Sequence, residues 1–147
     1  MSLFYEDLDP GRVLDAGARV VTAQDIERFA ELSGDRNPLH TDEAYARGTL
    51  FGSRVAHGAL GIAVVTGLVS AAGFTRESLI ALTGIAWRFR APVRAGDTMA
   101  AELRVAERRD GGRADGGTVV FAVTVRNQRG EVVQEGELRE LVRKRGG

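Results

Sequence analysis

The sequence contains no cysteine, and it has only two histidines and one lysine among its 147 residues. The lack of cysteine excludes a disulfide framework, a thiolate nucleophile and a metal site with cysteine ligands. The two histidines, His40 and His57, are the only side chains that ordinarily change charge near neutral pH. Their surroundings are therefore the first place to look for acid–base chemistry.

Neither sign of charge is in excess. Twenty basic and twenty acidic residues give a formal net charge of zero. The chain therefore lacks the basic surplus that usually accompanies binding to a phosphate backbone. We expect no nucleic-acid partner.

Long hydrophobic runs are also missing. The longest, 59–72, is shorter than the roughly 20 residues that cross a bilayer, and polar residues and glycines interrupt it. Residues 1–11 carry three acidic side chains and no apolar stretch of the kind found in an export signal. These features predict a cytoplasmic protein with no membrane partner.

What the sequence does contain fits one domain of the α+β class. Thr22 and Asp25 have the spacing of a capping box, at the start of a helix that Gly34 is expected to end. Thr41 is expected to cap a short second helix. Residues 58–72 are apolar on nearly every side of a helical wheel, so this long helix should be buried on nearly all sides.

The rest of the chain is typical of antiparallel strands. Four strands are predicted, over 84–90, 98–106, 118–126 and 132–142, with a flexible loop at 111–117 and a hairpin turn at 127–130. A run of strands after one buried helix predicts a sheet wrapped around that helix. Such a sheet has free edges, and two edges that pair in a dimer cover them. We expect a single domain over 1–147, with its core at about 5–142 and a flexible C-terminal tail.

Two short segments carry groups suited to catalysis. Asp35 and His40 lie on the turn after the first helix, so a carboxylate and an imidazole can converge on one water or substrate. Asn37 can hold this turn through side-chain-to-backbone hydrogen bonds. Gly58 opens the apolar helix, where free N–H groups suit a developing oxyanion. The spacing equally allows a structural interpretation, in which Asp35 caps a turn, His40 is a surface or core histidine and Gly58 only lets the chain enter the helix.

Three motifs occur together in one order: F-x-x-L-S-G-D-x-N-P-L-H at 29–40, V-A-H-G-A-L at 55–60 and R-F-x-x-P-V-x-x-G-D at 88–97. This set resembles the signature of the MaoC-like, (R)-specific enoyl-CoA hydratases, also called type 2 hydratases. That family has the hot-dog fold, in which an antiparallel sheet wraps around a long central helix. The resemblance covers about residues 5–140.

The resemblance implies reversible syn hydration of a trans-2-enoyl thioester to an (R)-3-hydroxyacyl thioester. Asp35 and His40 would hold one water between them and act jointly as acid and base. Asn37 would orient the loop, and the Gly58 N–H would meet the thioester oxygen.

The resemblance also implies the partners of the chain. The acyl group would be carried by coenzyme A or by a carrier protein, with no metal or redox cofactor, and the chain would form a homodimer or a higher homo-oligomer. The acyl chain would lie beside the central helix. Four residues are candidates for the walls of its pocket: Phe51, Leu68, Phe74 and Trp87.

Two other functions stay open. A hot-dog thioesterase would act on a similar thioester, but such enzymes commonly place a carboxylate on the central helix, and 58–72 contains no acidic residue. A catalytically silent subunit of a heteromeric dehydratase would be expected to lose Asp35 or His40, and both are present.

Overall fold

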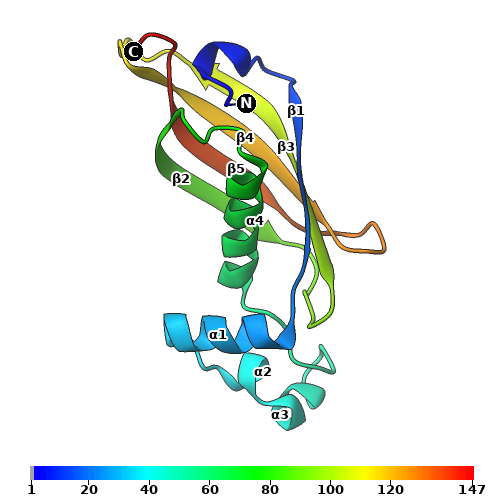
Figure 1. Cartoon of the computed structure of the whole chain (residues 1–147). Helices are drawn as coiled ribbons and strands as arrows, with labels where there is room; N and C mark the ends of the chain where they lie inside the picture. Colours follow the sequence, from blue (N-terminus) through cyan, green and yellow to red (C-terminus); the bar gives the residue numbers. More distant parts are fainter. Residues whose placement is uncertain (1) are drawn as a thin grey trace.

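Five antiparallel strands form a single sheet in the computed structural model, which describes residues 2–147 (Figure 1). The strands are β1 (Val13–Val20), β2 (Leu79–Phe89), β3 (Thr98–Arg109), β4 (Gly116–Arg126) and β5 (Val132–Arg143). Their order across the sheet is β1-β3-β4-β5-β2, so β1 and β2 are its edges. The predicted α+β class and the last four strands are confirmed, although β2 begins five residues earlier than expected.

Strand β1 has no counterpart in the sequence prediction, because its residues lack the alternation of a half-buried strand. Only Leu14 and Ala16 are buried. The register against β3 shifts between Asp15 and Gly17, where Gly17 has a φ of +82°. Such a bulge puts the inward and outward positions out of step. The strand is defined by its pairing with β3 and not by a pattern of its own.

Helix α1 (Ala23–Ser33) begins and ends where the sequence predicts. Thr22 Oγ1 accepts a hydrogen bond from Asp25 N–H at 3.1 Å, and Asp25 Oδ2 accepts one from Thr22 N–H at 2.9 Å. The hydrogen bond from Thr22 N–H is the main reason that the pKa of Asp25 lies below its usual value. Gly34 ends the helix with a φ of +77°, a left-handed conformation that suits glycine.

The short second helix is in fact two helices, and Thr41 caps neither. α2 (Pro38–Thr41) begins after Asn37, and α3 (Glu43–Arg47) begins after Asp42. The Asp42 carboxylate accepts a backbone N–H from the first turn of α3 at 3.0 Å. Thr41 Oγ1 donates instead to the carbonyl oxygen of Asn37 at 3.2 Å. Aspartate is the better N-cap of the two neighbours, so the helix begins one residue later than expected.

The central helix α4 (Gly58–Ala72) matches its predicted bounds and lies across one face of the sheet, while α1, α2 and α3 gather beyond its N-terminal end (Figure 1). Four of its apolar side chains are buried in the main core: Leu60, Val64, Val65 and Val69. The other side of the helix is exposed and carries small residues: Ala59, Ala63 and Gly67. The expectation of burial on nearly all sides is therefore wrong for a single chain. No helix within residues 2–147 has the length and hydrophobicity to cross a membrane.

The predicted loop at 111–117 is shorter than expected, because Gly116 and Gly117 belong to β4. A Cβ on Gly117 would lie 2.4 Å from the ring of Tyr5, in the short 3-10 helix Tyr5–Asp7. The glycine is needed there for close packing and not for flexibility. Glycine content alone cannot distinguish the two uses.

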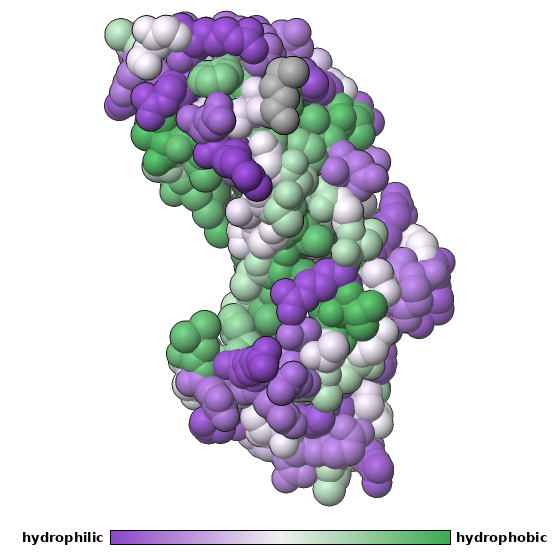
Figure 2. All heavy atoms as spheres, viewed as in Figure 1, coloured by the Kyte–Doolittle hydropathy of each residue, from purple (hydrophilic) through white to green (hydrophobic). Residues whose placement is uncertain are grey.

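Strand β2 leaves large hydrophobic side chains exposed along one edge of the sheet. Four of them are 43% to 56% exposed: Leu79, Leu82, Ile85 and Phe89. Figure 2 shows hydrophobic surface on the side of the molecule where β2 and α4 lie. The other edge strand, β1, exposes two valines beside an arginine and carries the bulge at Gly17. The hydrophobic edge is therefore β2.

Glu140 is a carboxyl group buried within β5. The residue is 5% exposed, and its Oε2 has no hydrogen-bond partner. Burial raises the pKa of Glu140 to about 7, and a hydrogen bond from the Thr75 hydroxyl lowers it only in part. The folded protein therefore keeps a proton on Glu140 at pH values where the unfolded chain has lost it.

Replacement of Glu140 by Gln should remove a pH-dependent loss of stability. As the pH rises from the ordinary glutamate value of 4.5 to about 7, only the folded state holds this proton, so the free energy of unfolding should fall by about 3 kcal/mol. Urea denaturation near pH 5 and pH 8 measures this fall in the wild type and in Glu140→Gln. Glu137→Gln, at an exposed glutamate of the same strand, is the control. Equal pH dependence in the wild type and Glu140→Gln would contradict this account.

Candidate active site

A series of short-range hydrogen bonds shapes the turn between α1 and α2. Ser33 Oγ accepts a hydrogen bond from Asp35 N–H at 3.1 Å, and Asp35 Oδ1 accepts one from Asn37 N–H at 3.2 Å. Asn37 Oδ1 accepts from Leu39 N–H at 3.0 Å and so caps α2, whose first residue is Pro38. The turn is therefore built by its own side chains. It leaves Asp35 and Asn37 exposed at the surface.

His40 lies half-buried in α2, with one ring nitrogen held by the backbone. Its Nδ1 is 2.7 Å from the carbonyl oxygen of Val55. A carbonyl oxygen only accepts hydrogen bonds, so this contact requires a hydrogen on Nδ1 and leaves Nε2 as the second nitrogen of the ring. Nε2 is thus the nitrogen of His40 that can exchange a proton with a bound molecule.

His57 brings Asp35 and His40 together, although it is not among the predicted site residues. Its ring stacks on that of His40 with 4.0 Å between the centroids. Its Nε2 is 2.9 Å from the backbone carbonyl oxygen of Asp35. The three residues each offer a polar side-chain atom within 4.8 Å of the others. The sequence offers two signals for His57, the scarcity of histidine and its place in the V-A-H-G-A-L motif, but spacing does not place residue 57 beside residue 35.

A cavity of about 430 Å³ opens beside His40 and Gly58. Its lining is mainly apolar and includes Leu39, Phe51, Val55, Phe89 and Val93. Of the predicted site residues, His40 and Gly58 line this cavity, whereas Asp35 and Asn37 do not. His40 therefore links the cavity to the turn that carries Asp35. Of the four candidates for an acyl pocket, Phe51 alone borders this cavity. The other three pack against the core: Leu68, Phe74 and Trp87.

Gly58 is the first residue of α4, so its N–H has no acceptor within the helix. The ring of Phe89 lies close above it, and a Cβ on residue 58 would be 2.8 Å from two carbons of that ring. Glycine therefore lets other groups approach the backbone at the positive end of the helix dipole. This is the environment that a developing negative charge requires.

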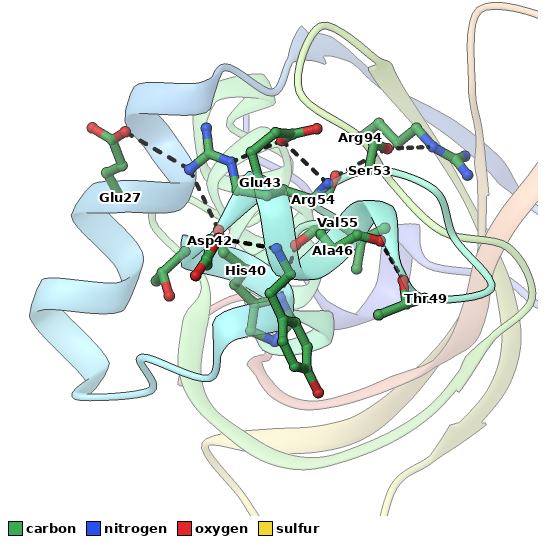
Figure 3. A network of polar contacts seen from close by, with 12 residues as sticks. Glu27, His40, Asp42, Glu43, Ala46, Thr49, Ser53, Arg54, Val55 and Arg94 are labelled. Atoms are coloured by element: carbon green, nitrogen blue, oxygen red, sulfur yellow. Dashed lines mark hydrogen bonds and ion pairs between the residues drawn. The ribbon is translucent and has the colours of Figure 1, made fainter.

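Arg54 ties the segment before the central helix to the three short helices (Figure 3). Its Nε is 3.3 Å from Glu43 Oε2 in α3, and its Nη1 is 3.8 Å from Glu27 Oε1 in α1. The same Nη1 is 3.5 Å from the carbonyl oxygen of His40 in α2. These contacts hold the chain next to Val55, which is the acceptor for the His40 ring.

A metal ion would find few free ligands in this cluster. Nδ1 of His40 and Nε2 of His57 both face backbone carbonyl oxygens, and Nδ1 of His57 is fully buried. Two donors remain, the Asp35 carboxylate and Nε2 of His40, whereas a protein-bound transition metal usually has three or four protein ligands. The donor set fits proton exchange better than metal coordination.

Three comparisons relate this arrangement to known proteins. The MaoC like domain model matches residues 7–127. A 3-hydroxybutyryl-CoA dehydratase of Methylorubrum extorquens is 39% identical over 107 residues, which are 71% of this chain and 65% of that protein. An (R)-specific enoyl-CoA hydratase of Rhodospirillum rubrum is 34% identical over 149 residues, which cover 97% of this chain and 94% of that protein.

Solved structures agree with the family model. A MaoC-like dehydratase from Rhodospirillum rubrum superposes with a TM-score of 0.88 at 32% identity, over 99% of both chains. A double hot-dog protein of Mycobacterium tuberculosis shares the fold. The protein is thus a hot-dog protein of the α+β class. It belongs to the MaoC-like family of hydratases and dehydratases.

Replacement of Asn37 by Ala should lower the free energy of unfolding by about 1 kcal/mol, because Leu39 N–H loses the acceptor that caps α2. Asn37→Asp keeps an acceptor oxygen and should restore most of the loss. Thr41→Ala, at the hydroxyl that caps no helix, is the matched control and should cost less. Urea denaturation of the three variants measures the order. A larger loss for Thr41→Ala than for Asn37→Ala would contradict the assignment of the cap.

Proposed function

We propose that this protein reversibly hydrates trans-2-enoyl thioesters to (R)-3-hydroxyacyl thioesters. The observation that carries the proposal is the meeting of Asp35 and His40 beside a mainly apolar cavity that also reaches the Gly58 N–H. The names of the relatives, an (R)-specific enoyl-CoA hydratase and a 3-hydroxybutyryl-CoA dehydratase, support the same reaction. Coenzyme A or a carrier protein would hold the acyl group, and the reaction needs no metal or redox cofactor.

Asp35 and His40 act on one water as a pair. Asp35 takes a proton from the water while the water oxygen forms a bond to the β-carbon of the substrate. His40 begins the cycle with hydrogen on both ring nitrogens. It keeps the one that faces Val55 and delivers the one on Nε2 to the α-carbon on the same face, which gives syn addition. The proton on Asp35 then returns to His40, and the pair is ready for the next turnover. Because the two groups share the work, the roles of acid and base belong to the pair.

Gly58 supplies the third element of the mechanism. When water adds to the β-carbon, negative charge moves to the thioester oxygen and an enolate forms. The free N–H at the start of α4 can donate a hydrogen bond to this oxygen. Loss of one such donor typically raises the barrier by about 3 kcal/mol. Asn37 acts at a distance, because its cap holds the turn on which Asp35 lies.

The alternative functions have less support. A thioesterase of this fold would use a carboxylate on the central helix, and α4 contains no acidic residue. A silent subunit would have no need for Asp35 and His40, whose polar side-chain atoms lie within 4.8 Å of each other.

Asp35→Asn and His40→Gln should each lower turnover by about a hundredfold or more, because each removes one half of the proton exchange. Loss of the conjugated thioester absorbance of crotonyl-CoA, and of a longer enoyl-CoA, measures the rate, and chiral analysis identifies the product. Asp9→Asn, at an exposed aspartate outside the site, is the matched control. Wild-type activity in either site variant, or formation of the (S) product, would refute the proposal.

We also infer that two copies pair through β2. This strand is an edge of the sheet with four exposed hydrophobic side chains, and the exposed small residues of α4 allow a second helix to approach closely. Pairing of two β2 strands would satisfy unpaired backbone groups and cover both features at once.

A charge on the β2 edge should separate the copies. Ile85→Arg places a cation on this surface, so light scattering at micromolar concentration should report a monomer where the wild type is a dimer. Val13→Arg makes the same change on β1, where Val13 is 45% exposed and Ile85 is 46% exposed, and should leave the dimer intact. A monomeric wild type would overturn the inference, as would a dimeric Ile85→Arg.

A further inference from the structure

His57 takes no part in the mechanism above, yet it contacts both residues that do. The residue is 2% exposed and immediately precedes α4 as its N-cap, although its side chain makes no capping hydrogen bond. Its Nδ1 is buried without any hydrogen-bond partner. A buried hydrogen-bond acceptor without a partner destabilises the folded state. A histidine is therefore an unfavourable choice here unless its other contacts matter.

The first of these contacts fixes the position of the Asp35 backbone. Nε2 of His57 is 2.9 Å from the carbonyl oxygen of Asp35. As with His40, a carbonyl acceptor requires a hydrogen on the nitrogen that faces it. His57 therefore carries its hydrogen on Nε2, whereas His40 carries its hydrogen on Nδ1. When both rings are neutral, they are therefore neighbours in opposite tautomers.

The second contact fixes the plane of the His40 ring. The two imidazoles stack with 4.0 Å between centroids and 28° between planes. The ring of Phe29 packs against His57 with 4.9 Å between the centroids and 57° between the planes, so His57 is itself held in place. With Nδ1 of His40 bonded to Val55 and one face covered by His57, the direction of its Nε2 is determined.

We propose that His57 is a positioning residue that sets the distance between the Asp35 carboxylate and Nε2 of His40. It holds Asp35 through a hydrogen bond and His40 through its ring face, and the same rigid side chain makes both contacts. The titratable groups that face it are Asp35 and His40. This role rests on the proposed hydratase function, because it concerns the geometry of that pair.

Two substitutions separate the contacts. His57→Gln keeps an N–H donor near the Nε2 position but removes the ring, and His57→Phe keeps the ring but removes the donor. If both contacts matter, each variant should lower kcat by about 10- to 100-fold, the usual effect of a supporting group, while KM changes by less than about threefold. Unchanged kcat in His57→Phe would mean that the side chain only fills space, and it would overturn the proposal.

A second measurement does not depend on activity. The chain has only two histidines, so a long-range ¹H–¹⁵N spectrum of the wild type at about pH 8 should contain two imidazole patterns, one with hydrogen on Nδ1 and one with hydrogen on Nε2. In His57→Gln, the remaining His40 ring should show altered shifts because its stacking partner is gone. Two identical tautomers, or an unchanged His40 in the variant, would overturn the proposal. If the wild type fails to hydrate enoyl-CoA but shows the opposite tautomers, the function fails and the arrangement of His57 stands.

Discussion

The packing of one face of α4 against the sheet is the interaction on which the remaining structure depends. The buried valines and leucine of this helix fix its axis, and a fixed axis fixes the point at which the helix begins. Everything proposed for catalysis lies at that point. Gly58 is the first residue of the helix, and His57 precedes it. The turn with Asp35 and His40 contacts His57 through a hydrogen bond and a stacked ring. The hydrophobic core therefore determines the geometry of a polar site that lies outside it.

The polar site itself is held largely by backbone oxygens. The carbonyl oxygen of Val55 determines which nitrogen of His40 carries hydrogen, and that of Asp35 does the same for His57. The carbonyl oxygen of His40 accepts a hydrogen bond from Arg54. Backbone groups move less than side chains, so they select tautomers without long flexible partners. The cost is the unpartnered Nδ1 of His57, which the fold tolerates at a position where two contacts must be rigid.

Local rules account for much of what the sequence predicts. The capping box at Thr22, the end of α1 at Gly34 and the bounds of α4 depend on neighbours within four residues, and each is confirmed. The exposed side of α4, the strand β1 and the position of His57 were beyond such rules. They depend on contacts between residues far apart in the chain, such as the 22 positions between Asp35 and His57. The pairing of carboxylate and imidazole could be predicted, but the ring that aligns them could not.

The aromatic ring of Phe89 belongs to two surfaces at once. It closes over Gly58 at the cavity, and it also ends the exposed edge of β2. A neighbouring strand laid along that edge would restrict this ring, and loss of the neighbour would free it to swing away from the backbone N–H. If two copies pair through β2 as proposed, assembly and substrate fit would be linked through this one side chain. Such a dimer would have a specific activity that falls as the solution is diluted, even though the groups proposed for catalysis all belong to one chain.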